Sequence, residues 1–190
     1  MSHPDDTGRT AAGLAIPRPG PDEHAPVFAD EIALVPAHDD FAQLLRDQLD
    51  ATRALAGAFG EAQAACRYAD GKWTVRETIG HLADCERVLS YRLLRALRGD
   101  ATTLAGFDHG AYVPAGHFEA RTLAAVVSEF AAVRAATIAL VADAMPSQFA
   151  FNLPVGSGRI SARALAYLIA GHERHHQALL RERYLPAVEG

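Results

Sequence analysis

The sequence predicts an all-α protein built as a four-helix bundle. Four segments of about twenty residues carry apolar side chains three and four positions apart, the spacing that gathers them on one face of a helix. Each segment lies between a capping residue and a Gly or Pro. No stretch alternates apolar and polar residues strongly enough to require a sheet. With 190 residues, the chain is long enough to bury one sizeable core.

The first two predicted helices have clear ends. The first covers about Asp39–Phe59 and stops near a pair of glycines. The second covers about Val75–Arg98 and begins at Thr74, which forms a capping-box pattern with Glu77. Gly99 follows its last turn and is a good terminator.

The last two predicted helices are equally long. The third covers about Arg121–Ala144 and is stopped by Pro146. The fourth covers about Ser161–Tyr184, with its first residue as the cap and Pro186 as its end. A short strand pairing of residues 149–153 with 159–160 is a weaker expectation for the loop between them.

The connection between the second and third helices, about Gly99–Ala120, is long for a simple bundle. Long loops of this kind are often functional or serve as crossovers. It contains Asp108, His109 and Tyr112, which are candidates for substrate contact or acid–base chemistry.

Residues 1–26 form a polar, Pro-rich arm, and residues 27–186 form the bundle domain. The arm has no helical periodicity, so it is either flexible or wrapped on the surface. Val27–Val35 is more apolar and could pack as a short turn of helix.

Composition excludes several classes of protein. A net charge of −5 gives no electrostatic basis for nucleic-acid binding. Two Cys exclude a disulfide scaffold and any multi-cysteine zinc module. The apolar runs are too short to span a bilayer, and no secretory signal is recognisable. We therefore expect a soluble, cytoplasmic protein without membrane contact.

Histidines replace apolar residues on two helical stripes. His172 and His176 stand one turn apart on the stripe of the fourth helix, and His81 lies beside Leu82 on the second. Buried imidazoles need partners, and a divalent metal satisfies several at once. Three histidines that leave one position open are typical of catalytic zinc sites, although nickel, iron or manganese would also bind. The alternative is three half-buried histidines that form ordinary hydrogen bonds, and His175 could replace His176.

Other polar residues near these stripes have two readings each. Asp84 or Glu86 could orient a ligand histidine, or form a salt bridge on the surface. Cys85 could be a ligand or nucleophile, although a small core residue is the simpler interpretation. A basic side of the second helix could receive a carboxylate-bearing thiol or substrate, or be a solvated face; it comprises Arg87, Arg92, Arg95 and Arg98.

Two motifs resemble a known family. Residues 72–84 (KWTVRETIGHLAD) resemble the K-W-S-x-x-E-x-x-x-H-L-x-D signature of the DinB superfamily, and residues 171–176 (GHERHH) resemble its H-x-x-H-H element. The intervening Gly106-Phe107-Asp108 and Tyr112 are similar as well. The resemblance covers about residues 27–186.

The resemblance implies a fold, a metal and a class of chemistry. The fold is an up-down-down-up four-helix bundle with a long crossover between helices two and three. The metal, zinc or nickel, is held by residues that correspond to His81, His172 and His176. Independently of the resemblance, the positions of His175, Asp84, Asp108 and Tyr112 make them candidates for supporting the metal or contacting substrate. Relatives include transferases of low-molecular-weight thiols, and isomerases and hydrolases that depend on such thiols; many are homodimers.

Three functions remain open on these grounds. The first is metal-dependent transfer of a low-molecular-weight thiol to a small electrophile. The second is metal-dependent hydrolysis of a small molecule; Glu173 follows His172 directly and so points off the ligand face, which slightly favours thiol transfer. The third is a non-catalytic, dimeric metal- or ligand-binding module.

Overall fold

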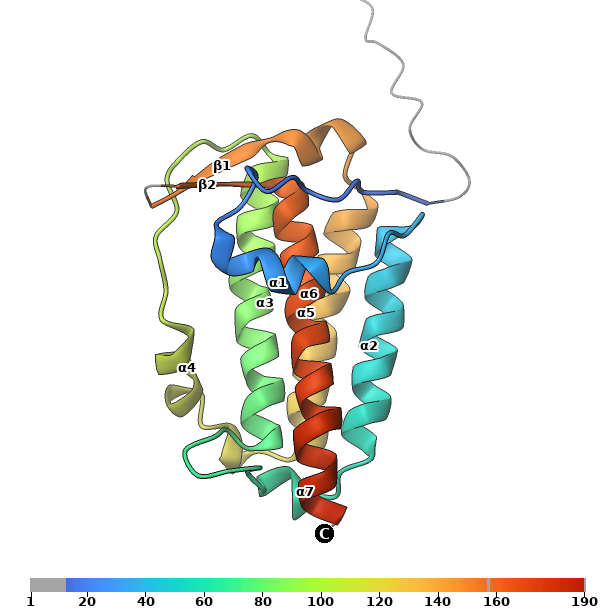
Figure 1. The fold of residues 1–190 in the computed structure, drawn as a ribbon, viewed down its shortest axis with the longest axis vertical. Coiled ribbons are helices and arrows are strands. Elements are labelled where there is room, and N and C mark those ends of the chain that lie inside the picture. The colour runs from blue at the N-terminus through green and yellow to red at the C-terminus, as the bar shows by residue number, and fades with distance from the viewer. Residues whose placement is uncertain (1–12, 157, 190) are drawn as a thin grey trace, which may run out of the picture.

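The computed structural model describes residues 13–156 and 158–189, and confirms a mostly helical bundle (Figure 1). Helix α3 packs against α5 and α6, and α2 packs against the same two helices. Their bounds are α2 Phe41–Gly57, α3 Val75–Leu97, α5 Leu123–Ala142 and α6 Ala162–Leu179. Two short elements precede α2: η1 Pro26–Phe28 and α1 Ala29–Ala33. Other short α-helical and 3-10 elements lie between the long helices: η2 Gln63–Ala65, α4 His109–Ala115, η3 Phe118–Ala120 and η4 Pro146–Ala150.

Side-chain caps fix the starts of the long helices. The Asp40 carboxylate accepts a hydrogen bond from Gln43 N at 3.0 Å, and Ser161 Oγ accepts one from Ala164 N at 3.0 Å. Thr74 and Glu77 form the complete capping box predicted for α3. These caps satisfy backbone donors that have no partner inside the helix.

The C-terminal end differs from the prediction. A π-helical turn, η5 Leu180–Tyr184, follows α6, and α7 Leu185–Glu189 continues the helical course. Pro186 therefore does not end the helical run. It is the second residue of α7, directly after the π-helical turn.

A two-stranded hairpin joins α5 to α6. Strand β1, Asn152–Val155, pairs antiparallel with β2, Gly158–Ser161, with Leu153 opposite Ile160. Leu153 and Ile160 are both buried. Figure 1 shows the hairpin lying across the upper end of the bundle. The weakly expected pairing therefore forms and closes that end of the core.

Residues 13–26 lie against the bundle. Leu14 and Ile16 are buried, and Tyr167 donates its hydroxyl hydrogen bond to Ile16 O at 2.8 Å. Glu23 forms an ion pair with Arg163 at 2.5 Å. This part of the Pro-rich arm wraps the surface, which was one of the two alternatives; residues 1–12 lie outside the described part of the chain.

Helix α1 crosses α6 in direct backbone contact. A Cβ on Gly171 would stand 2.1 Å from Glu31 O, so only glycine permits this approach. Figure 1 shows α1 crossing in front of α6. The contact brings the N-terminal segment over the part of α6 that carries the histidines.

Helix α5 is the one described helix that is long and apolar enough to cross a membrane, with a mean hydropathy of 1.7. It packs between α2 and α3, and Arg134 at its centre is fully buried among polar side chains of the bundle. A core helix of a folded bundle passes the same test of length and composition. A charged residue that finds its partners inside the bundle fits that interpretation.

Candidate metal site

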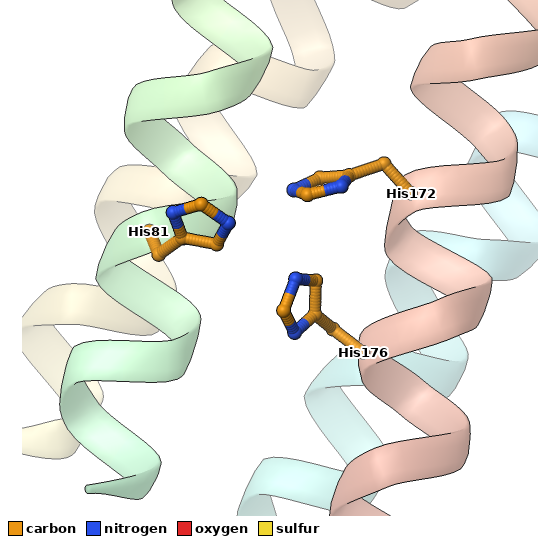
Figure 2. Close-up of side chains that lie close together, drawn as sticks. All are labelled: His81, His172 and His176. Carbon is orange, nitrogen blue, oxygen red and sulfur yellow. The ribbon is translucent and has the colours of Figure 1, made fainter. Parts of the chain in front are cut away.

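Three imidazoles converge between α3 and α6. His81 comes from α3, and His172 and His176 come from successive turns of α6 (Figure 2). Their nitrogen ligand atoms all lie within 4.8 Å of one another. The ring centroid of His81 is 5.0 Å from each of the other two, which are 4.7 Å apart. The structure thus brings together the three histidines that the sequence singled out, with His176 rather than His175 as the third.

Two nitrogens of this cluster are buried without a partner. His172 Nε2 and His176 Nδ1 have no hydrogen-bond partner among the described residues. An unpaired polar atom in the interior costs about 1–3 kcal/mol. Two such atoms at the same place are therefore a cost that a bound ligand would relieve.

Two of the imidazoles, those of His81 and His176, are held neutral. Burial, together with the neighbouring His172, lowers the pKa of His81 to about 3. Burial and the same neighbours lower the pKa of His176 well below its usual value. Because a histidine binds a metal through a neutral imidazole, these residues are ready to act as ligands at neutral pH.

The donor set fits a divalent metal. Imidazole nitrogens bind zinc at about 2.0–2.1 Å, so nitrogens this close need only small side-chain adjustments to share one ion. Three histidines leave a fourth position open, the arrangement of catalytic rather than structural zinc sites.

Glu31 orients one of the three rings. Its Oε1 lies 3.4 Å from His172 Nδ1. Burial raises the pKa of Glu31, but the hydrogen bond with His172 and the neighbouring histidines His172, His175 and His109 together hold that pKa below its usual value. A proton on Nδ1 leaves Nε2, the unpartnered nitrogen, as the free lone pair of His172. The close contact of α1 with Gly171 sets Glu31 in this place.

Trp73 packs against the imidazoles. Its ring centroid is 4.6 Å from that of His81 and 6.5 Å from that of His176. Tyr184 fixes its backbone by donating a hydrogen bond to Trp73 O at 2.6 Å. Trp73 therefore covers the ligand cluster from the start of α3.

Cys85 lies one turn beyond His81. Its Sγ is 3.5 Å from His81 Nδ1, and its side chain is buried. Burial, with Asp84 and Glu31 nearby, raises the pKa of the thiol to about 12. Cys85 is therefore a neutral thiol in the wall of the site, and lies outside the cluster of three ligand atoms.

A pocket of about 350 Å³ opens beside the imidazoles. Its wall is mostly apolar and aromatic, the usual character of small-molecule sites. It is lined by Val27, Phe28, Glu31, Trp73, His81, Cys85, Leu89, Arg92, Phe107, His109, Leu168, His172, His175 and His176. The open side of the histidine cluster therefore faces a space that can hold a small molecule.

Two predicted site residues line this pocket as exposed side chains. The His175 ring centroid is 5.0 Å from that of His176. His109, at the start of α4, has its ring centroid 5.4 Å from that of His81. The long connection thus contributes an imidazole to the site.

The structure does not bring the other candidates to the imidazoles. Asp84 pairs with Arg87 at 3.2 Å instead of orienting a histidine. Asp108 caps α4 by accepting hydrogen bonds from Gly110 N and Ala111 N. Tyr112 is 42% exposed, and its ring packs 5.7 Å from that of Phe107, outside the pocket wall.

A second polar cluster lies on the other side of α6. Arg134, fully buried in α5, donates to both carboxylate oxygens of Glu86 at 2.7 and 2.6 Å and pairs with Glu173. Glu173 also accepts a hydrogen bond from Thr52 Oγ1 at 2.6 Å. As predicted, Glu173 points away from the ligand face, but its partner Arg134 was not anticipated. The pKa of Glu173 is raised, and burial is the main cause.

Two functional residues, Arg134 and Glu31, were not singled out from the sequence. Arg134 stands four positions after Phe130 on the apolar stripe of its helix, a pattern that indicates a buried charge in need of partners. The signal for Glu31 is weaker. An acidic residue in a short apolar turn is noticeable, but the sequence does not indicate which helix it contacts.

The fold and the site together define a helical-bundle protein with a three-histidine candidate metal centre. The family model of the DinB superfamily matches residues 44–180, so the chain belongs to that superfamily. This confirms the family that the two sequence motifs indicated.

A solved structure has a similar fold. YfiT from Bacillus subtilis, described as a "probable metal-dependent hydrolase with an unusual four-helix bundle topology", superposes with a TM-score of 0.70 at 20% sequence identity. The match covers 77% of this chain and 85% of YfiT. The comparison with curated proteins gives no match.

Proposed function

We propose that the protein is a divalent-metal-dependent enzyme that acts on a small molecule in the pocket beside its three histidines. One observation carries this proposal: His172 Nε2 and His176 Nδ1 are buried, unpartnered among the described residues, and gathered with His81 at the wall of the pocket. Zinc and nickel both accept such a ligand set.

The metal and the chain contribute different parts of the chemistry. When bound, the metal would lower the pKa of a thiol or water in its open position and so supply a nucleophile at neutral pH. Glu31 fixes the ring of His172, and Trp73 covers His81 and His176. The apolar wall holds the substrate and excludes water from the reacting groups.

Our first candidate reaction is transfer of a low-molecular-weight thiol to a small electrophile. The thiol must come from outside the chain, because Cys85 stays protonated with its pKa near 12. Thiol transfer needs no general base once the thiolate is formed. This suits a pocket whose one carboxylate, that of Glu31, is engaged with His172.

The second candidate is hydrolysis of a small molecule. His109 is exposed at the pocket, 5.4 Å from the His81 ring, where an imidazole could take a proton from water. The description of YfiT as a probable metal-dependent hydrolase also supports this candidate.

Metal content per chain tests the proposal. We expect close to one equivalent of zinc or nickel in the wild type by elemental mass spectrometry, almost none in His172→Ala, and wild-type content in the matched control His175→Ala. Turnover of electrophilic substrates with and without an added thiol then separates the two reactions. No metal after reconstitution with excess zinc and nickel would contradict both reactions and favour a binding module.

We also propose a cytoplasmic homodimer. The outer face of α5 exposes small apolar side chains, among them Ala132, Ala136 and Ala139, and Tyr91 and Leu94 of α3 are exposed by 54% and 39%. Sedimentation velocity should show a dimer for the wild type and a monomer for Ala136→Glu. A monomeric wild type at micromolar concentration would overturn this arrangement.

The order of helix directions that we propose is up-down-down-up. The segment between α3 and α5, residues 98–122, supports this order. It includes α4 and runs along the outside of the bundle from one end to the other (Figure 1). This course would make the segment a crossover that also forms one wall of the pocket through Phe107 and His109.

A further inference from the structure

Arg92 shares a face of α3 with His81. The two residues are eleven positions apart, which is close to three full helical turns, and both line the pocket. Their Cα atoms are separated by about 16 Å along the helix axis at 1.5 Å per residue. The pocket therefore has the three imidazoles towards one end and a guanidinium towards the other.

The charge of Arg92 has no counter-charge. The residue is only 9% exposed, yet it forms no ion pair within residues 13–156 and 158–188. By contrast, Arg134, the fully buried arginine of α5, is paired with Glu86 and Glu173. An arginine remains charged in proteins, and a buried charge without a partner is destabilising. A ligand that carries a negative charge would remove this cost.

The guanidinium is held in place for such a ligand. Arg92 Nη2 donates to Ala105 O at 2.9 Å, and the guanidinium lies 5.1 Å from the centre of the Phe107 ring. Both contacts come from the connection between α3 and α5. They use one of its five N–H donors and one of its faces, so other donors remain for a ligand.

The surroundings of Arg92 are apolar. Phe28, Leu89 and Leu168 line the pocket beside it. A second cavity of about 210 Å³ shares Phe28, Arg92 and Leu168 with the pocket, and Arg159 is among its other lining residues. The space between the imidazoles and the two arginines suits an apolar body, not a polar one.

We propose that Arg92 binds the carboxylate of an apolar substrate whose reactive group lies at the three histidines. A planar guanidinium matches a carboxylate, with which it can form two parallel hydrogen bonds. This inference rests on the proposed function only in placing the reactive end at the histidines. The substrate class is thus a small carboxylic acid with an aliphatic or aromatic body.

Binding of paired probes tests the inference. Zinc-loaded protein is titrated calorimetrically with phenylalkanoates of two to six chain carbons and with the corresponding neutral amides. We expect at least one carboxylate to bind about 10- to 100-fold more tightly than its amide, the range for a hydrogen-bonded charged group. Arg92→Gln should abolish this preference, and Arg98→Gln, an exposed arginine at the end of the same helix, should keep it.

Each outcome decides the matter. Equal affinities for carboxylate and amide, or no carboxylate binding at millimolar concentration, would overturn the inference in the wild type alone. A preference that survives in Arg92→Gln would place the carboxylate on the metal instead and would also overturn it. If Arg92→Gln does not fold, Arg92→Lys replaces it. This variant should keep the preference for carboxylates in weakened form, because the charge stays while the paired geometry is lost. An unchanged preference in Arg92→Lys would contradict carboxylate pairing by the guanidinium.

Metal content of the same samples separates this inference from the proposed function. A protein that takes up no metal but prefers carboxylates contradicts the proposed function alone. A zinc-loaded protein without the preference contradicts the assignment of Arg92 alone.

Discussion

At the scale of single residues, the site depends on how each imidazole is oriented. His172 has one nitrogen near the Glu31 carboxylate and the other buried and free for a ligand. A carboxylate that holds the far nitrogen of a ligand histidine fixes its tautomer and increases its basicity. Glu31 is therefore part of the metal site although it does not touch the ion.

Replacement of Glu31 by Gln should lower the affinity for zinc by about 10- to 100-fold, the usual effect of losing such a partner. Competition with a chromophoric chelator measures this change directly. Asp30→Asn is the matched control, because Asp30 is an exposed neighbour on the same short helix. Equal zinc affinities for the two variants would show that Glu31 does not orient the ligand.

The neutral imidazoles predict a pH dependence of the metal-free protein. His81 has a pKa of about 3 when folded and about 6.5 when unfolded, so between these values only the unfolded chain takes up the proton. The free energy of unfolding should then fall as the pH falls below about 6.5, by up to about 1.4 kcal/mol per pH unit from this residue. The pKa of His176 is lowered in the same direction and adds to the slope.

Urea unfolding at pH 7, 6 and 5 measures this slope. In His81→Gln the loss of stability on acidification should be smaller than in the wild type, since the other titrating groups are common to both proteins. Parallel pH profiles for the two proteins would contradict a neutral, buried His81.

At the scale of elements, α6 separates two polar clusters. One side carries His172 and His176 towards α3, and the other carries Glu173 towards Arg134 of α5. The short helix α1 reaches the first side only because Gly171 lets its backbone approach. The packing of α6 therefore limits substitution on both faces of its middle turns.

Gly171→Ala should disturb the contact between α1 and α6. Its new Cβ would lie 2.1 Å from Glu31 O, which is backbone and cannot move alone. We expect a loss of stability of about 1–3 kcal/mol in urea unfolding, together with weaker zinc binding. Gly57→Ala, at a helical glycine with open space around it, should be neutral or stabilising by up to about 1 kcal/mol. Equal effects at both positions would contradict the close approach.

Arg134→Met should be strongly destabilising. It leaves the carboxylates of Glu86 and Glu173 buried without their cation, a change that typically costs about 3–5 kcal/mol. Thermal and urea unfolding measure the loss, with the exposed Arg46→Met as a control expected within about 0.5 kcal/mol of the wild type. Replacing all three charged residues by apolar ones should recover most of the stability. A triple variant as weak as Arg134→Met would show that the ion pairs themselves stabilise the fold.

The elements differ in how far the sequence predicts them. The long helices follow from periodicity and caps, and the capping box of Thr74 and Glu77 fixes the start of α3 to the residue. The three histidines follow from their places on apolar stripes. Glu31 does not follow in the same way, because its role depends on which segments pack across the bundle. The sequence places Arg92 on a basic side of its helix but does not separate it from Arg87, Arg95 and Arg98. The prediction that Pro186 ends the last helix is wrong, because a π-helical turn precedes it and α7 follows directly.

At the scale of the whole molecule, the core does not depend on the metal site. Two apolar clusters fill the bundle, and the three histidines lie between α3 and α6. The protein should therefore keep its helical circular dichroism after the metal is removed by a chelator.

Rebinding of metal should nevertheless raise the stability. At a free zinc concentration about a thousandfold above the dissociation constant, binding to the folded state alone adds about 4 kcal/mol. Thermal unfolding with and without zinc measures this, and His172→Ala should show almost no shift. Loss of helical structure on chelation would instead identify the metal as structural.

The contact of α1 with α6 places part of the pocket wall outside the region that the family model matches. The family model begins at residue 44, whereas the segment that supplies Val27, Phe28 and Glu31 to the pocket precedes it. Comparison confined to the shared region would overlook these residues. A chimaera that exchanges the segment ahead of residue 41 for that of another member would retain the three histidines and replace part of the pocket wall. The N-terminal segment thus shapes the pocket of this chain separately from the helices that carry the histidines.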